Sequence, residues 1–177
     1  MTGKHWPLWL AFILAALGIV IAEQALASPT CEAAVSLTYG NTSETRPKRA
    51  VESCRRVSKL SRALGVPESL GVAVATYESS LDRTRVSSSG AVGVMQIKVH
   101  YHCPPYLGIR LCKSHAELAE SGVRYLARLL TRYDEQKALT CYHDGISACR
   151  RGKARSRYSD GVQSTHRAIM RRRQGER

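Results

Sequence analysis

The stretch of sequence that decides the fold is 67-PESLGVAVATYESSLDRTRVSSSGAVGVMQ-96. Pro67 stands where a helix can begin, because the first turn does not need the missing N–H. Apolar residues dominate from Leu70 to Tyr77, and a helix that is apolar on most sides is usually a buried one. We expect this helix to end near Glu78 and the Ser- and Gly-rich segment 83–93 to be a loop.

Glu78 is therefore a carboxylate at the end of a buried helix. The C-terminus of a helix carries partial negative charge, which disfavours an ionised carboxylate there. Burial beside Tyr77 and Val74 acts in the same direction. A carboxylic acid that stays protonated near neutral pH can donate its proton to a leaving oxygen. By position alone, the alternative is an exposed glutamate at a frayed helix end.

The loop after Glu78 leads to an amide side chain. Glycines at 90 and 93 allow a ligand to approach the backbone closely. Gln96 offers both donors and acceptors, which suit sugar hydroxyls and acetamides. The short segment 94–99 is compatible with a strand or a helix.

Helical periodicity flanks this stretch on both sides. The pattern predicts a helix from Val51 that stops at Gly65, and a second from about His115 to Tyr133. On the second helix an arginine stripe opposite the apolar face is interpreted as a solvated surface; its members are Arg124, Arg128 and Arg132.

Shorter elements complete a mainly α chain. A helix is expected to end near Tyr142, with Gly145 stopping it and another helix starting near Ser147. Residues 28–50 show no clear periodicity, and 41–47 are polar and predicted to be loop. The tail from Arg171 is expected to fray, and no β-hairpin is predicted.

The N-terminus is typical of an export signal. A basic start at Lys4 and His5 precedes the apolar run 6–22 and the small-residue site 25–27. We predict cleavage after Ala27, with an uncleaved anchor as the alternative. Residues 28–177 would then form one domain, without stable membrane insertion.

Six cysteines follow the predicted signal, and an even number in an exported chain favours disulfides. A zinc site is disfavoured because no C-x2-C pair exists, so no metal is expected. Proximity suggests the pairs Cys31–Cys54, Cys103–Cys112 and Cys141–Cys149. The segment 100–113, which holds two prolines and two of these cysteines, is predicted to be a stapled loop. Disulfides also place the protein in the periplasm or outside the cell.

The net charge of +13 requires an anionic partner or a solvated basic surface. Nucleic acid, cell wall and anionic lipid all fit this charge. Export argues against nucleic acid, which we do not expect as a partner.

Four motifs in order resemble those of the soluble lytic transglycosylase family. Glu78-Ser79 and Gly90-Ala91-Val92-Gly93-Val94-Met95-Gln96 look like its E-S and G-A-x-G-L-M-Q motifs. The segment 122–126 resembles its G-x-x-Y-L helix, and 141–145 lies where the family has A-Y-N-A-G. The resemblance covers about 64–150, with a weaker echo around 158–167.

The resemblance implies a single lysozyme-like α domain that needs no cofactor. The family cleaves the β-1,4 bond between N-acetylmuramic acid and N-acetylglucosamine in peptidoglycan and forms a 1,6-anhydro product. Glu78 would act first as acid and then as base. The expected substrate contacts are Ser87, Met95, Gln96, Tyr142 and His143. We expect a monomer, and local wall opening for a secretion or conjugation apparatus is one role that fits it.

Three departures from the family pattern concern substrate detail. His143 replaces an asparagine, Lys98-Val99 replaces Met-Pro, and the loop 100–113 is unusual. A hydrolytic muramidase is an alternative, with Asp82 or Asp144 as a second carboxylate, although either could simply be a turn former. Two classes without glycan cleavage also fit the sequence: a non-catalytic wall-binding protein and a cationic protein that acts on membranes.

Overall fold

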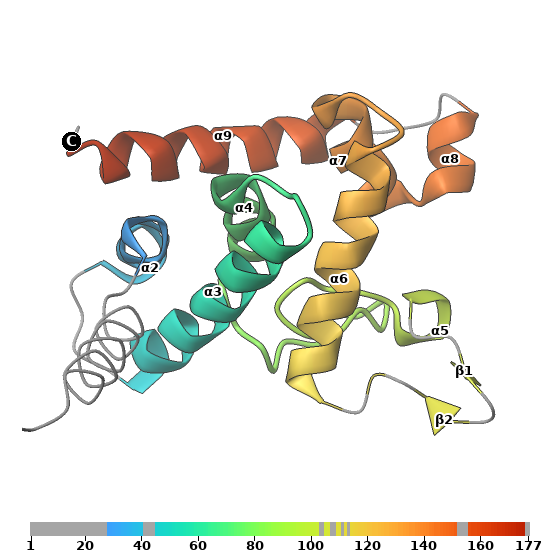
Figure 1. The fold of residues 1–177 in the computed structure, drawn as a ribbon, viewed down its shortest axis with the longest axis horizontal. Coiled ribbons are helices and arrows are strands. Elements are labelled where there is room, and N and C mark those ends of the chain that lie inside the picture. Colours follow the sequence, from blue (N-terminus) through green and yellow to red (C-terminus); the bar gives the residue numbers. More distant parts are fainter. Residues whose placement is uncertain are drawn as a thin grey trace, which may run out of the picture.

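The computed structural model describes residues 28–40, 45–102, 105–106, 109–110, 112, 114–151 and 156–175. Within these ranges the chain is a mainly helical single domain, as predicted (Figure 1). The helices are α2 (Pro29–Tyr39), α3 (Thr45–Ala63), α4 (Glu68–Ser79), α5 (Val99–His102), α6 (His115–Leu130), α7 (Glu135–Asp144), α8 (Ile146–Arg150) and α9 (Ser156–Arg173). None of the described helices is long and apolar enough to cross a membrane.

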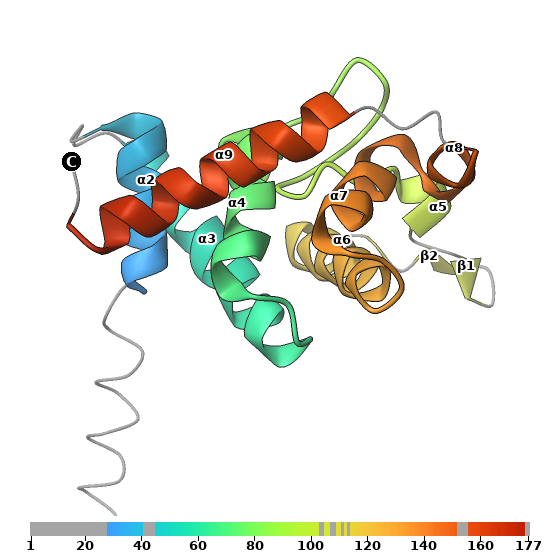
Figure 2. The same cartoon turned by 90° about the horizontal axis from the view of Figure 1, so that it is seen from above.

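The central element is α4, the apolar helix predicted from Pro67 onward. Its side chains at Leu70, Val72 and Val74 are fully buried. Figures 1 and 2 show α9 running across α4, with α3 on another side and α2 near the C-terminal end of α9. An all-round apolar helix is stable here because neighbouring helices cover most of its surface.

The N-terminal part is more helical than its sequence pattern predicts. Residues 28–50 include α2 and the start of α3, and α3 begins at Thr45, inside the segment 41–47 that was expected to be loop. Residues 41–44 lie outside the described part of the chain. Pro29 occupies the first turn of α2, and Cys31 on this helix forms the predicted disulfide with Cys54 on α3. The helix therefore depends on tertiary contacts that local periodicity does not report.

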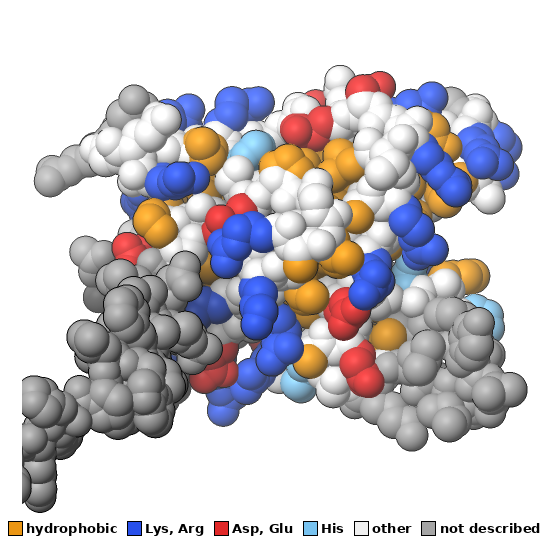
Figure 3. Space-filling view, in the orientation of Figure 1, with side chains coloured by type: hydrophobic (Ala, Val, Ile, Leu, Met, Phe, Trp, Pro, Cys, Tyr) orange, Lys and Arg blue, Asp and Glu red, His pale blue; other side chains and the backbone are white. Residues whose placement is uncertain are grey.

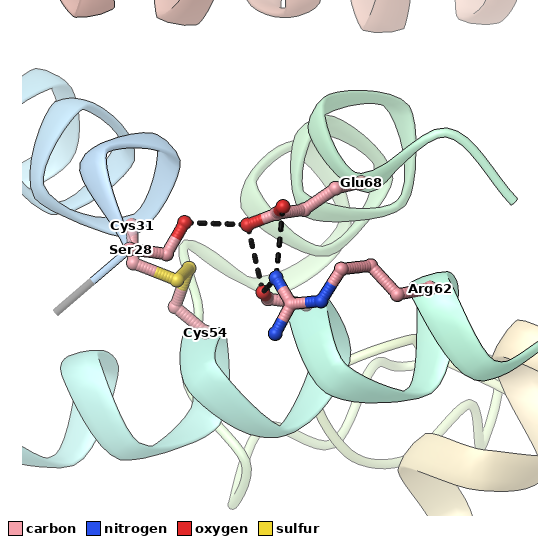
Figure 4. Close-up of polar contacts among 6 residues, drawn as sticks. Ser28, Cys31, Cys54, Arg62 and Glu68 are labelled. Carbon is pink, nitrogen blue, oxygen red and sulfur yellow. Dashed lines mark hydrogen bonds and ion pairs between the residues drawn. A yellow bond between two sulfur atoms is a disulfide. The ribbon is translucent and has the colours of Figure 1, made fainter. Parts of the chain in front are cut away.

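A carboxylate network reinforces the same corner of the molecule (Figure 4). Glu68, in the first turn of α4, accepts hydrogen bonds from Ser28 and Ser58 and forms an ion pair with Arg62 at 2.8 Å. The network thereby ties α4 to the start of α2 and to α3.

The segment 83–93, between α4 and α5, is a loop, as predicted. Ser80 and Leu81 both have positive φ angles, 56° and 62°, which turn the chain sharply at the end of α4. Val92 bridges both Val86 and Ile97. The segment 94–99 is neither a strand nor a full helix: a tight turn ends in the bridge at Ile97, and α5 starts at Val99.

The segment 100–113 contains a short antiparallel pair, β1 (Pro105–Tyr106) with β2 (Ile109–Arg110). The prediction of no hairpin was wrong at this point, because two-residue strands give no alternation to detect. Cys103 lies outside the described residues, so the Cys103–Cys112 pair stays a prediction.

The second long helix, α6, starts with a capping box between Ser114 and Glu117. Gly145, with a φ of 80°, separates α7 from α8 as expected. The predicted Cys141–Cys149 disulfide joins these two helices. At the C-terminus, α9 continues to Arg173 rather than fraying from Arg171.

Candidate active site

A cleft of about 920 Å³ opens beside the C-terminal end of α4. The 85–98 loop and α5 line one part of it, and α6, α7 and the start of α8 line the rest. The structure brings most of the predicted site residues together here, although they come from separate parts of the sequence; those that line the cleft are Glu78, Ser87, Gln96, Tyr142 and His143.

Glu78 lies in the last turn of α4 and is partly buried. Its Oε1 accepts a hydrogen bond of 2.6 Å from the hydroxyl of Tyr158 on α9. The alternative of a frayed, exposed glutamate is therefore not what the structure shows. The carboxyl group is fixed at the wall of the cleft, where it can exchange a proton with a bound molecule.

Burial raises the pKa of Glu78. The hydrogen bond from Tyr158 lowers it, as do the charges of a protonated His143 and of Arg85, but burial prevails. The protonated form of Glu78 therefore persists to higher pH than in an exposed glutamate. This is the direction that the helix terminus and the apolar surroundings predicted.

Tyr158 is itself held from two sides. Its ring meets that of Tyr77 edge-on at 5.4 Å between centroids, and His143 stacks on it at 4.5 Å. Burial and the nearby Glu78 raise the pKa of Tyr158 well above its ordinary value, so the hydroxyl keeps its proton. Gly161, one turn along α9, leaves the space that Tyr77 occupies: a Cβ there would lie 2.5 Å from the Tyr77 ring.

The role of Tyr158 was not predicted. It lies 80 residues from Glu78 in the sequence, and no local pattern reports so distant a contact. The one signal in the sequence was the weaker resemblance to the family around 158–167.

Tyr142 lines the cleft and is tied to Met95 in the core. The Tyr142 hydroxyl donates to the Met95 carbonyl oxygen at 2.8 Å. Met95 is fully buried and does not line the cleft, so its side chain belongs to the core. It packs against Gly122 on α6, where a Cβ would lie 2.4 Å from the Met95 Cβ.

Ser87 and Gln96 shape the loop as well as the cleft. The Ser87 Oγ accepts a hydrogen bond from the Ala91 N–H at 2.9 Å. The Gln96 Nε2 donates to the carbonyl oxygens of Arg85 and Gly93 at 3.0 and 2.9 Å. Because these bonds occupy the Gln96 amide nitrogen, its side-chain oxygen is the atom best suited to receive a ligand donor.

The two other candidate carboxylates differ in position. Asp82 caps a turn, since its Oδ1 accepts from the Thr84 N–H and hydroxyl, and it does not line the cleft. Asp144 does line the cleft, with its Oδ1 2.8 Å from the Nδ1 of His143. The turn-forming interpretation therefore fits Asp82 better than Asp144.

Three cations and an aromatic ring also line the cleft. Lys98 comes from the loop, and Arg128 and Arg132 come from α6 and the turn after it. The arginine stripe is thus not merely a solvated face: two of its three members border the cleft. Tyr101 on α5 is 73% exposed and lines the same cleft, and an exposed aromatic ring in a groove is a common feature of ligand sites.

No group of three His, Cys, Asp or Glu side chains in the described ranges could hold a metal ion. A family model described as the transglycosylase SLT domain matches residues 56–163, more than half of the chain. No curated protein matches the sequence.

Proposed function

This chain belongs to the transglycosylase SLT domain family, and we propose that Glu78 is the single acid and base with which it cleaves glycan strands. Membership of this family indicates a transglycosylase that acts on peptidoglycan. The observation that carries the proposal is the partly buried Glu78 carboxyl group at the cleft wall, with its pKa raised by burial and its position fixed by Tyr158.

In the first step, protonated Glu78 donates its proton to the oxygen between N-acetylmuramic acid and N-acetylglucosamine. The bond from this oxygen to the anomeric carbon of the muramic residue breaks, and the N-acetylglucosamine end leaves as an alcohol. Positive charge develops at the anomeric carbon. The Glu78 carboxylate that has just formed lies beside it and is stabilised by the Tyr158 hydroxyl.

In the second step, the 6-hydroxyl of the same muramic residue attacks the anomeric carbon. Its proton passes to the Glu78 carboxylate, which returns to the protonated state. The product is a 1,6-anhydro sugar, and no water is consumed. A single carboxyl group suffices because the nucleophile belongs to the substrate, whereas an ordinary glycosidase needs two.

Hydrolysis is the second candidate, since Asp144 lines the cleft and could activate a water. The His143–Asp144 contact of 2.8 Å engages this carboxylate, which makes it a poorer base. Mass spectrometry of digested strands separates the two reactions. Anhydro ends support the transglycosylase, and reducing muramic ends together with loss of activity in Asp144→Asn would establish the muramidase.

The Glu78→Gln variant tests the proposal most directly, because it keeps size and removes the proton. Removal of an acid and base group is expected to lower kcat at least about 100-fold. The control is Glu120→Gln, an exposed carboxylate of α6 that pairs with Arg124 away from the cleft. Retained lysis by a folded Glu78→Gln protein would refute the role, and glycan binding without turnover by the unmodified protein would favour a non-catalytic wall-binding protein.

For location, we propose the periplasm, with the protein acting as a monomer on glycan strands. The disulfides Cys31–Cys54 and Cys141–Cys149 are consistent with export. The predicted signal 1–27 lies outside the described residues. Local wall opening for a secretion or conjugation apparatus is a role that this location permits, and its cellular test is loss of that apparatus in a Glu78→Gln strain.

A further inference from the structure

The cleft wall carries more positive charge than acid chemistry at Glu78 needs. Lys98, Arg128 and Arg132 line it, and all three are exposed. The acidic side chains on the same lining are Glu78 and Asp144. Burial raises the pKa of Glu78, and Asp144 lies against His143. We call the part of the lining formed by Lys98, Arg128 and Arg132 the basic wall.

Three of the arginines outside the cleft are held in ion pairs. Arg62 forms an ion pair with Glu68, Arg83 with Glu52, and Arg124 with Glu120. In the described ranges no ion pair joins a carboxylate to any residue of the basic wall. Figure 3 shows Lys and Arg side chains gathered over α8 and the neighbouring part of α6. Cations grouped in a concave site attract an anionic ligand, because the cleft concentrates their field.

Arg128 also affects its surroundings within the cleft. Burial and the charge of Arg128 both lower the pKa of His102, which lines the cleft too. Arg128 is exposed to solvent and lines the same cleft as His102. A neutral His102 adds no repulsion to the basic wall and can hydrogen-bond to a bound ligand.

The glycan backbone offers no partner for this charge when stems are attached. Its sugars are neutral, and the lactyl carboxyl group is then an amide. The free carboxylates of peptidoglycan are on the peptide stems. We propose that the basic wall binds stem carboxylates, so that the enzyme selects strands whose stems carry free rather than amidated carboxyl groups. This inference rests on the proposed function, and the planar guanidinium of arginine is well matched to a carboxylate.

The test compares glycan strands that differ only in stem charge. One set has free carboxyl groups on uncross-linked stems, and the second has those groups amidated. We expect kcat/KM for anhydro product to be about three- to tenfold higher on the free-carboxyl strands, the sum of a few exposed ion pairs. The preference should weaken as salt rises.

The variant Arg128→Gln/Arg132→Gln should lose this preference while keeping kcat, because binding of a remote stem changes KM first. The matched control is Arg124→Gln, one turn earlier on the same helix but paired with Glu120 outside the cleft. It should keep the preference in full. Equal rates on free and amidated strands, a preference for amidated strands, or an equal effect of Arg124→Gln would overturn the proposal.

A binding measurement separates this inference from the proposed function. Calorimetry with Glu78→Gln protein compares affinity for the same two strand preparations without turnover. A weaker affinity for amidated strands supports the basic wall even if the unmodified protein forms no anhydro product, an outcome that would refute the proposed reaction alone. Equal affinities would refute the basic wall whatever the reaction proves to be.

Discussion

At the scale of single residues, Glu78 is subject to two opposing influences. Burial favours the neutral acid, and the Tyr158 hydroxyl favours the carboxylate. The proposed reaction uses both forms in turn, first as acid and then as base. A group with two such roles is most effective when neither form is strongly disfavoured near the working pH. The Tyr158 hydroxyl therefore does more than hold Glu78 in place: it opposes the rise in the Glu78 pKa that burial causes.

Replacing Tyr158 with phenylalanine tests this balance. The hydroxyl lowers the Glu78 pKa, so its loss should raise that pKa further. The protonated acid would then persist to higher pH, and the alkaline limb of the pH profile of kcat/KM should shift to higher pH. The measurement is kcat/KM against pH for both proteins. Maximal kcat should fall, because the carboxylate formed in the first step loses its donor.

The phenylalanine ring keeps the contacts with Tyr77 and His143, so the fold should be retained. Tyr39→Phe is a matched control, since that hydroxyl donates to the Ser80 carbonyl oxygen outside the cleft. An alkaline limb that stays in place in Tyr158→Phe would show that the hydrogen bond does not tune Glu78.

The sequence supported a prediction for Glu78 but not for its partner. The helix terminus and the apolar neighbours of Glu78 lie within ten residues of it in the sequence, and such local features can be inferred from spacing. The contact with Tyr158 depends on where α9 crosses α4, which is set by packing along both helices. Met95 was predicted in the cleft because its motif neighbours are there, yet it points into the core. A motif identifies a segment and does not say which of its side chains point inward.

At the scale of elements, the crossing of α9 over α4 positions the site. Gly161 permits the two helices to approach, because the Tyr77 ring fills the space where a side chain would be. Tyr77 in turn meets Tyr158 edge-on. A change in this spacing should therefore reach Glu78 through two aromatic rings.

We predict that Gly161→Ala destabilises the protein by about 1–3 kcal/mol, the usual cost of overpacking. In an ordinary helix interior the same change would stabilise by about 0.5–1 kcal/mol, so the sign is diagnostic. Activity should fall as well, since Tyr77 must move. Denaturant unfolding and kcat measure the two effects. Ser164→Ala, exposed on the same helix, should change neither; stabilisation by Gly161→Ala would contradict the close crossing.

Element predictions succeeded where the pattern was long and periodic. The helices α4 and α6 were predicted close to their observed bounds, and Gly145 was recognised as a stop. The helix at α3 was predicted from Val51, whereas it begins at Thr45. The helix α2 was missed because its stability comes from the Cys31–Cys54 disulfide and from packing on α9. The arginine stripe of α6 was interpreted as solvated because periodicity separates polar from apolar faces and does not reveal a cleft.

At the scale of the whole molecule, the two described disulfides have different places. Cys31–Cys54 joins α2 to α3 and closes a separation of 23 residues. Cys141–Cys149 closes only eight and brackets Tyr142, His143 and Asp144, which line the cleft. The first therefore belongs to the stability of the domain, and the second also belongs to the shape of the site.

Paired serine substitutions should separate these effects. Loss of Cys31–Cys54 should lower the free energy of unfolding by about 3 kcal/mol, from the loop-closure estimate, and loss of the shorter Cys141–Cys149 loop by slightly less. The kcat/KM of each variant is measured well below both melting temperatures and divided by that of the unmodified protein. This relative kcat/KM should be much lower for Cys141→Ser/Cys149→Ser than for Cys31→Ser/Cys54→Ser. Equal losses of activity in the two variants would contradict a special role for the second disulfide.

The Glu68 network gives stability a pH dependence. Burial alone would raise the pKa of Glu68, but hydrogen bonds from Ser28, Ser58 and Arg62 hold it below its ordinary value. Because the folded pKa is lower than the unfolded one, the carboxylate contributes stability above the unfolded value, about 4.3, and that contribution is lost as pH falls through the folded pKa.

We therefore expect Glu68→Gln to lower the free energy of unfolding at pH 7 by about 1–2 kcal/mol, the range for hydrogen bonds to a charged group at a partly exposed site. The gap between variant and unmodified protein should close as pH falls below about 4, where the wild-type carboxylate is protonated. Denaturant titrations of both proteins from about pH 3 to pH 7 measure this difference in unfolding free energy across the titration range of a carboxylate. Glu120→Gln, in an exposed pair, should cost no more than about 0.5 kcal/mol. A gap for Glu68→Gln that stays constant with pH would mean that the network acts by packing, because only the ionised carboxylate can make the contribution titrate.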